Sequence, residues 1–189
     1  NDYLNIAPDG NRLTTIAETL RAAGREIGVL TTVSLDHATP AGFYAHVNSR
    51  RSYAMIADDL FASRFSFFAG GGFHDTPDAD EHASENGYTL VHSPADAPSG
   101  DGGGLIVSSD LLIGDYGVLP AIDGGERAHF LRDCTNLAID RLTNPNGFFM
   151  MVEGGRIDYF CHYNDAGSFV AELLDFDEAV AAAIAFYNA

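Results

Sequence analysis

The sequence contains no lysine, and all ten of its basic residues are arginines. They are outnumbered by 27 acidic residues, so the formal net charge is −17 at neutral pH. Because the phosphate backbone of a nucleic acid would be repelled over most of such a surface, nucleic-acid binding is not expected. The acidic, arginine-only composition fits a GC-rich genome as well as it fits adaptation to salt or secretion.

Long hydrophobic runs, a leader segment and cysteine pairs are also missing. No stretch approaches the ~20 apolar residues of a membrane-spanning helix, so no membrane span is expected. The chain starts at Asn1 and Asp2 with neither an initiator Met nor a signal peptide, which indicates a processed protein, a proteolytic remnant or an engineered piece. The two cysteines, Cys134 and Cys161, are too few for a disulfide framework, and we expect buried free thiols.

The 189 residues, 46% of them hydrophobic, are enough for one compact domain over 1–189. Residues 73–125 are rich in Asp, Pro, Gly and Ser and are predicted to be an irregular, loop-rich insert region. Periodicity and turn residues predict helices at 12–23, 52–62, 126–142 and 171–187. Short apolar runs predict strands at 27–35, 65–69, 88–92, 105–107, 111–113 and 148–152. This alternation predicts an α/β fold with a mainly parallel sheet and helices on both faces.

Polar clusters follow two of the predicted strands. One consists of Asp36, His37 and Thr39 after the strand at 27–35, and the other begins with Glu153 after the strand at 148–152. Because sites in open parallel sheets form outside the carboxyl ends of the strands, both clusters are candidates for chemistry.

The second cluster has the donors of a metal site. Asp158 and His162 are four residues apart, so on a helix they share a face and could reach one zinc ion. A carboxylate such as Glu153 suits magnesium. By spacing alone, the better explanation is a capping Asp and a surface His that form an ion pair, because such pairs are common on helices.

The first cluster also has an ordinary explanation. Thr39 is expected to cap a helix whose first residue is Pro40, and Arg50 and Arg51 are expected to be solvated charges. Only the two clusters together indicate a metal site with a cation for an anionic substrate.

Both clusters lie in longer segments that resemble the alkaline phosphatase family. Residues 28–32, 36–41 and 44–50 resemble the family's segment after its nucleophile. Residues 147–158, continuing through 161–162, 164–165 and 176–180, resemble its central metal-binding segment. The resemblance covers most of the chain and is loose only around 73–125. It implies an alkaline-phosphatase-like core, present in part.

The resemblance implies a function and site residues. Members of the family hydrolyse phosphate monoesters through a covalent phosphoserine or phosphothreonine, with two zinc ions and a third site that usually holds magnesium. By position, Asp158 and His162 resemble ligands of one zinc, and Thr39 and Glu153 resemble ligands of the magnesium. Arg50 resembles the arginine that binds two phosphate oxygens. His37 matches a near-site position that is Asp in some members and His in others.

Other parts of the family pattern are absent from this sequence. No Asp-Ser-Ala motif supplies the nucleophile, and no Asp-His pair follows Asp165. Each zinc would therefore keep only part of its usual three or four protein ligands. We expect an internal fragment of a larger enzyme that shows no turnover alone. The resemblance implies a periplasmic or secreted parent, with a homodimer as one possibility.

Two other readings stay open. The chain could be a non-catalytic module that binds metal or phosphate at a degenerate site, or a structural or interaction protein. A phosphatase assay with zinc and magnesium separates an inactive fragment of the enzyme from an intact enzyme, and a metal titration separates the binding module from the structural protein.

Overall fold

A five-stranded sheet organises the part of the chain that the computed structural model describes, residues 2–189 except 101–102, 110–118, 125–126 and 128. The strands are β1 (Glu26–Thr31), β2 (Phe67–Gly70), β3 (Tyr88–Val91), β4 (Gly104–Ser108) and β5 (Phe148–Glu153). They lie in the order β3-β4-β2-β1-β5, and every neighbouring pair is parallel. The predicted α/β fold with a parallel sheet is confirmed.

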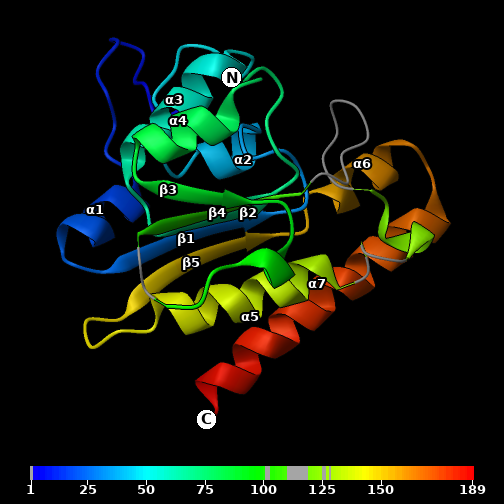
Figure 1. Ribbon diagram of the computed structural model, residues 1–189. Coiled ribbons are helices and arrows are strands. Elements are labelled where there is room, and N and C mark those ends of the chain that lie inside the picture. The colour runs from blue at the N-terminus through cyan, green and yellow to red at the C-terminus, as the bar shows by residue number, and fades with distance from the viewer. Residues whose placement is uncertain (1, 101–102, 110–118, 125–126, 128) are drawn as a thin grey trace.

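Helices cover both faces of this sheet (Figure 1). One face is covered by α1 (Ile16–Ala22), α2 (Ala38–Ala41), α3 (Tyr53–Ser63) and α4 (Ala79–Glu85). The other face is covered by α5 (Phe130–Leu142) and α7 (Ala166–Tyr187). The short helix α6 (Arg156–His162) lies beyond the carboxyl end of β5, and the 3₁₀ turns η1 (Pro94–Asp96) and η3 (Ala121–Asp123) lie in connecting segments.

Strand β1 is apolar almost throughout because both of its faces are buried. Ile27 and Val29 belong to the core under α1–α4, whereas Leu30 belongs to the core under α5 and α7. Gly28 faces α5, where an added Cβ would lie 2.7 Å from Leu142 Cδ1. The glycine therefore lets α5 approach the sheet closely. Each fully buried large apolar side chain contributes about 2 kcal/mol to the stability of this core.

Two helix boundaries differ from the predictions. The first helix, predicted at 12–23, begins at Ile16, because Thr15 and Glu18 form a capping box. The Asn11 side chain donates to Asp9 at 2.8 Å. The last helix begins at Ala166 rather than Ala171, because the Asp165 side chain accepts a hydrogen bond from the Ser168 amide at the helix start.

Residues 73–125 are more regular than their composition predicts. They supply α4, β3 and β4, and β3 and β4 form one side of the sheet. Helix α4 was missed because its residues are mostly polar and only Ala83 is buried. The strand predicted at 111–113 lies outside the described residues, and the division into one domain with an insert stays a prediction.

The cysteines agree with the prediction only in part. Both are free, but Cys134 is buried whereas Cys161 is exposed. The prediction of a buried thiol was wrong for Cys161 because α6 buries only Arg156 and Phe160. Among the described helices, none combines the length and the apolar character that crossing a lipid bilayer requires.

Candidate functional site

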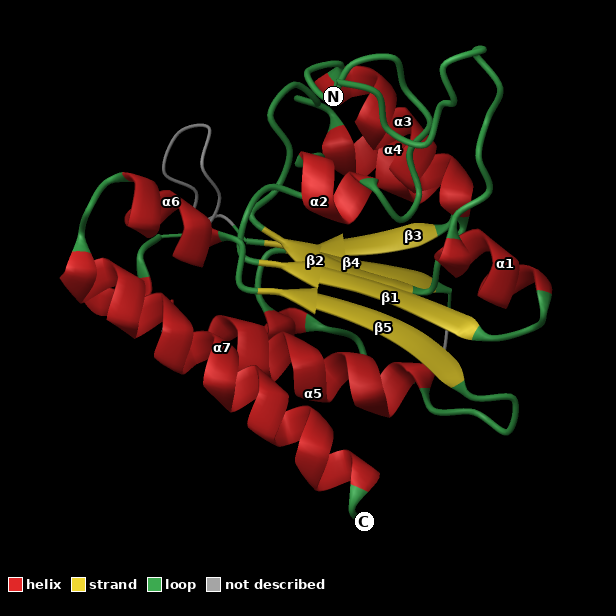
Figure 2. Cartoon of the chain, turned by 180° about the vertical axis from the view of Figure 1, so that it is seen from behind, coloured by secondary structure: helices red, strands yellow, loops and turns green. Residues whose placement is uncertain are grey.

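The two predicted polar clusters meet at one edge of the sheet. In the parallel pairing of β1 with β5, Thr31 lies opposite Glu153. Just beyond, the Thr32 amide donates to the Glu153 carbonyl at 3.1 Å, and the Arg156 amide donates to Thr32 Oγ1 at 3.2 Å. Helices α2 and α6 both lie at the end of the sheet to which the strand arrows point (Figure 2). The polar segments that follow β1 and β5 therefore start side by side.

Glu153 is the carboxylate at this edge. Thr31 Oγ1 donates to Glu153 Oε2 at 2.6 Å, and the Thr39 hydroxyl also hydrogen-bonds to the carboxylate. Burial raises the pKa of Glu153 above its usual value, and these two hydrogen bonds offset part of that rise. The result is a carboxylate surrounded by hydroxyl oxygens, the donor type that hard divalent cations prefer.

Thr39 does not cap its helix as predicted. Helix α2 runs over Ala38–Ala41, so Thr39 lies inside it and His37 occupies the N-cap position. The hydroxyl of Thr39 is therefore not used for capping, and it hydrogen-bonds to Glu153 at the end of β5. This placement brings Thr39 and Glu153 together.

His37 lies at the junction between the two strand ends. Its Nε2 is 3.1 Å from the hydroxyl of Tyr159 on α6. Burial lowers the pKa of His37 to about 4, and the positive charge of Arg50 contributes to the same shift. His37 is consequently neutral at neutral pH. Its Nδ1 is buried without a hydrogen-bond partner among the described residues.

Among the charged groups that shift the pKa of His37, Arg50 has the largest effect. It is exposed, and its charge acts on His37 more strongly than that of Asp36, the residue adjacent to His37 in the chain. The Arg50 amide donates to the Asp2 carbonyl at 2.7 Å, which fixes the backbone and leaves the guanidinium to solvent. Arg50 therefore lies on the same side of the fold as His37.

Asp158 and His162 form the pair that their spacing predicts. On α6, Asp158 Oδ2 lies 3.5 Å from His162 Nε2, and the side chains are 76% and 75% exposed. Asp158 is close enough to raise the pKa of both Glu153 and His37. In the described part of the chain, the imidazole of His162 pairs only with Asp158. Within the described residues, no three His, Cys, Asp or Glu side chains are grouped so that they could hold a metal ion.

Sequence reasoning missed several residues of this edge. Thr31 was counted only as part of a strand, and Tyr159 was not singled out. Ser34 and His74 were missed as well, and they join Asp36 of the first cluster, with His74 Nδ1 3.0 Å from Asp36 Oδ1 and 2.9 Å from Ser34 Oγ. His74 follows the end of β2, so the rule that led to the other two clusters would also have found it.

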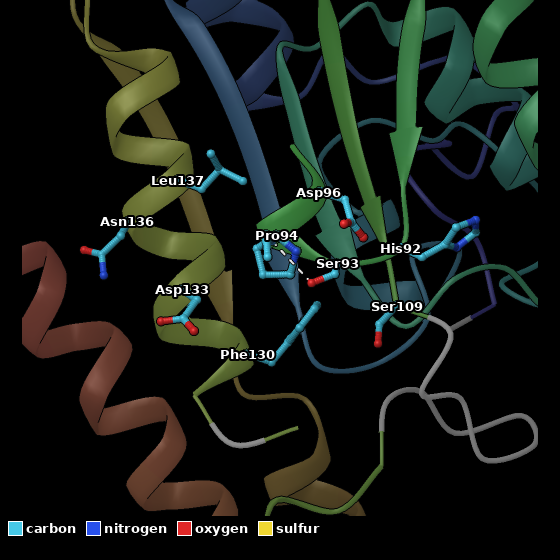
Figure 3. A pocket seen from close by; sticks show the side chains of 10 residues that line it. His92, Ser93, Pro94, Asp96, Ser109, Phe130, Asp133, Asn136 and Leu137 are labelled. Atoms are coloured by element: carbon cyan, nitrogen blue, oxygen red, sulfur yellow. Dashed lines mark hydrogen bonds between the residues drawn. The ribbon is translucent and has the colours of Figure 1, made fainter. Parts of the chain in front are cut away.

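A separate cavity of about 780 Å³ lies at the ends of β3 and β4 (Figure 3). His92 and Ser93 follow β3, Ser109 follows β4, and Phe130 and Asp133 face it from α5. None of the predicted site residues lines this cavity. The candidate site is therefore the edge formed by β1 and β5.

The arrangement has a defined chemical capability. A half-buried carboxylate with two hydroxyls can take up a divalent cation, and an exposed guanidinium can bind a tetrahedral oxyanion through two parallel hydrogen bonds. The imidazole of His37 adds no charge at neutral pH, because its pKa is lowered to about 4.

Comparisons with known proteins point in one direction. The alkaline phosphatase family model matches residues 1–64 and 112–189. Alkaline phosphatase 3 of Bacillus subtilis is 32% identical over 98% of this chain, and alkaline phosphatase of Escherichia coli is 28% identical over 91%. The alkaline phosphatase of the Antarctic bacterium TAB5 superposes with a TM-score of 0.85 at 32% identity, covering all of this chain and 56% of its own. A cold-active alkaline phosphatase from Shewanella sp. gives 0.89 at 29% identity, covering all of this chain and 46% of its own.

The chain spans 42% of the length of the Bacillus subtilis relative and 48% of the Escherichia coli one. Over that span, the family match includes both β1 with its following segment and β5 with α6, the elements that form the site. A matching family model, relatives that align along nearly the whole chain and a shared fold lead to one conclusion: this chain belongs to the alkaline phosphatase family.

Proposed function

We propose that this chain provides the phosphate-binding and part of the metal-binding centre of an enzyme that hydrolyses phosphate monoesters. The observation that carries the proposal is the pairing of Thr31 with Glu153, which places Glu153, Thr39 and His37 at one edge of the sheet. The charge of Arg50 acts on the same edge. Family membership supports the reaction class.

Glu153 and Thr39 are proposed to hold a magnesium ion. Their oxygens are donors of the type that magnesium prefers. Because burial raises the pKa of Glu153, a cation beside the carboxylate would stabilise its charged form. A variant of the TAB5 alkaline phosphatase is described with Mg bound in its M3 site, and we assign Glu153 and Thr39 to the equivalent site here.

Asp158 and His162 are proposed to begin one zinc site. They supply a carboxylate and an imidazole on one helix face, with atoms 3.5 Å apart. Since zinc sites in proteins use three or four protein ligands, the others are proposed to come from outside the residues that the structure describes. When bound, zinc lowers the pKa of a coordinated water and stabilises a leaving oxygen.

Arg50 is proposed to bind the phosphate of the substrate. Its planar guanidinium matches two phosphate oxygens at once, which lysine cannot do. His37 stays neutral beside it, so it does not compete as a second cation for the same oxyanion. Tyr159 holds the His37 ring from α6.

Hydrolysis of p-nitrophenyl phosphate with added zinc and magnesium tests this function. We expect turnover by the complete protein that carries this sequence and only background hydrolysis by the chain alone. In the complete protein, Arg50→Ala should lower kcat/KM by about 10- to 100-fold, because it removes charged hydrogen bonds to the substrate. The matched control is Arg51→Ala, the adjacent exposed arginine, which should change little. Equal losses in both variants, or rapid turnover by the chain alone, would overturn these assignments.

A non-catalytic metal- or phosphate-binding module is the second candidate. It is favoured by the lack of a three-ligand cluster among the described residues. Under this alternative, the complete protein binds zinc and phosphate but hydrolyses nothing. Under both candidates, the affinity for zinc should fall in Asp158→Ala and His162→Ala, so turnover is the measurement that decides between them. A periplasmic or secreted location and a homodimeric parent stay predictions.

A further inference from the structure

His74 is held by a single buried carboxylate. Asp36, which is fully buried, accepts from the His74 amide at 2.7 Å through Oδ2 and pairs with His74 Nδ1 at 3.0 Å through Oδ1. Ser34 Oγ lies 2.9 Å from the same ring nitrogen. One carboxylate thus fixes both the backbone and the ring orientation of His74.

The backbone around His74 is tied to the same segment. The Gly71 amide donates to the Val33 carbonyl at 2.8 Å, and the Leu35 amide donates to the Gly72 carbonyl at 2.7 Å. The segment after β2 and the segment after β1 therefore run together as far as Asp36 and His74. This leaves His74 little freedom to move relative to the end of β1.

The His74 ring also contacts Tyr53, which belongs to another part of the site. The ring of Tyr53 stacks on His74 with 4.2 Å between centroids and an interplanar angle of 8°. Tyr53 is the first residue of α3 and follows Arg50 by three positions. Asp36 in turn is adjacent to His37 and three positions before Thr39. His74 therefore connects the segment of Arg50 with the segment of Thr39.

We propose that His74 is a positioning residue that sets the location of Arg50 relative to Thr39 and Glu153 by bridging Asp36 and Tyr53. It acts through Arg50 and touches neither metal nor substrate. The inference rests on the proposed function, because its consequence is measured as phosphate binding and turnover.

The test uses the complete protein with zinc and magnesium. His74→Phe keeps a ring to stack on Tyr53 but loses both ring hydrogen bonds, and His74→Asn keeps a donor for Asp36 but loses the stacking. Each should raise KM for p-nitrophenyl phosphate and the inhibition constant of inorganic phosphate about tenfold, while kcat changes less than about threefold. Tyr53→Leu should give the same pattern from the other end of the bridge, and Tyr53→Phe, which keeps the ring, should restore it.

A double-mutant cycle with Arg50→Ala separates positioning from a general structural effect. If His74 acts through Arg50, His74→Phe should change KM by less than about twofold once Arg50 is absent. The matched control is His82→Ala on α4. It removes another imidazole that packs on an aromatic ring, that of Phe61, with 5.8 Å between ring centroids. This control should leave KM unchanged.

Two results would overturn the inference. One is an unchanged KM and phosphate inhibition constant in His74→Phe, His74→Asn and Tyr53→Leu while the unsubstituted protein is active. The other is an equal effect of His74→Phe with and without Arg50. Lack of turnover by the unsubstituted protein would instead refute the proposed function, and direct titration with inorganic phosphate would then still report whether His74 positions Arg50.

Discussion

At the scale of single residues, burial favours the neutral form of both Glu153 and His37 at the strand ends. It raises the pKa of Glu153 and lowers the pKa of His37, so each group is driven toward its neutral form. The hydroxyls of Thr31 and Thr39 offset part of the effect on Glu153. This edge of the sheet is therefore poised to gain stability when a cation binds beside the carboxylate.

The first prediction concerns the protonation of His37. Its pKa of about 4 lies below the usual 6.5, so the unfolded chain binds a proton more readily than the folded one between these values. The His37 contribution to stability should accordingly be present above pH 6.5 and be lost as the pH falls toward 4. NMR titration of the His37 ring should show no midpoint near neutrality.

In His37→Gln, unfolding measured over the same acidic range should depend less on pH than in the unsubstituted protein. A His37 midpoint close to 6.5 would show that the ring is not buried as described.

At the scale of elements, the site depends on the tight turn between β5 and α6. Gly155 has φ −63° and ψ −25°, an ordinary helical conformation, so its backbone does not require glycine. The close packing does require glycine, because an added Cβ would lie 2.8 Å from Val33 Cγ1 and 3.2 Å from Glu153 Cδ. The turn thus packs β5 and α6 against the segment that follows β1.

Gly155→Ala should therefore disturb the site directly. We expect a loss of stability of about 1–3 kcal/mol from overpacking and weaker magnesium binding from the displaced Glu153 carboxylate. Chemical denaturation and magnesium titration check the two effects. Gly167→Ala on α7 is the matched control, because its Cβ would meet the exposed Ile122 side chain at 3.3 Å and Asp165 Oδ1 at an ordinary 3.6 Å. Equal behaviour of the two variants would contradict the role given to the turn.

A buried charge network fixes α7 next to the start of α6. Arg127 is fully buried, and its guanidinium pairs with Glu172 and with Asp175 at 2.9 Å each. The Ala121 amide also donates to Glu172 at 2.8 Å. Arg156 of α6 lies 3.9 Å from the same carboxylate. Glu172 thus joins the segment before α5 to both α6 and α7.

Removing the charge of Glu172 should be costly. Glu172→Gln leaves buried arginines with less compensation, and we expect a loss of about 3 kcal/mol in the free energy of unfolding, measured by chemical denaturation. The control on the same helix is Glu178→Gln, whose pairs with His129 and Arg132 are solvent-exposed and should contribute less than about 1 kcal/mol. If both variants unfold alike, the buried network does not stabilise α7 as argued.

At the scale of the whole molecule, the sequence predicted the architecture better than it predicted the details of the site. Apolar strands such as β1 and β5 are visible because burial on both faces demands uninterrupted hydrophobic residues. Contacts between distant segments are not visible, so the Thr31–Glu153 and His37–Tyr159 hydrogen bonds could not be foreseen. Thr39 was placed at a helix cap because capping is a local pattern, whereas its bond to Glu153 depends on strand pairing.

The described surface also exposes an apolar face on α7. Leu174, Ile184 and Tyr187 are 60%, 53% and 88% exposed, and α7 with Val152 of β5 lines an apolar groove of about 300 Å³. Strand β5 is the last strand of the described sheet on that side. Apolar surface of this kind, beside an open strand edge, favours association.

We therefore predict that this chain by itself self-associates, more strongly at high salt, because salt screens the repulsion from its net charge of −17. Light scattering at low and high salt measures the effect. Ile184→Glu should reduce association, whereas Met55→Glu, at an exposed position on α3, should not. A monomer at both salt concentrations would show that the apolar face of α7 does not drive self-association.

The most direct test of the central claim is the anomalous scattering of manganese, used in place of magnesium, in crystals of the complete protein grown with phosphate. The claim is that the ends of β1 and β5 form one pocket for a cation and a phosphate. It predicts a manganese peak about 2 Å from the oxygens of Glu153 and Thr39, with phosphate on the guanidinium of Arg50. Manganese and phosphate bound elsewhere, with Glu153 still bonded only to Thr31 and Thr39, would contradict it.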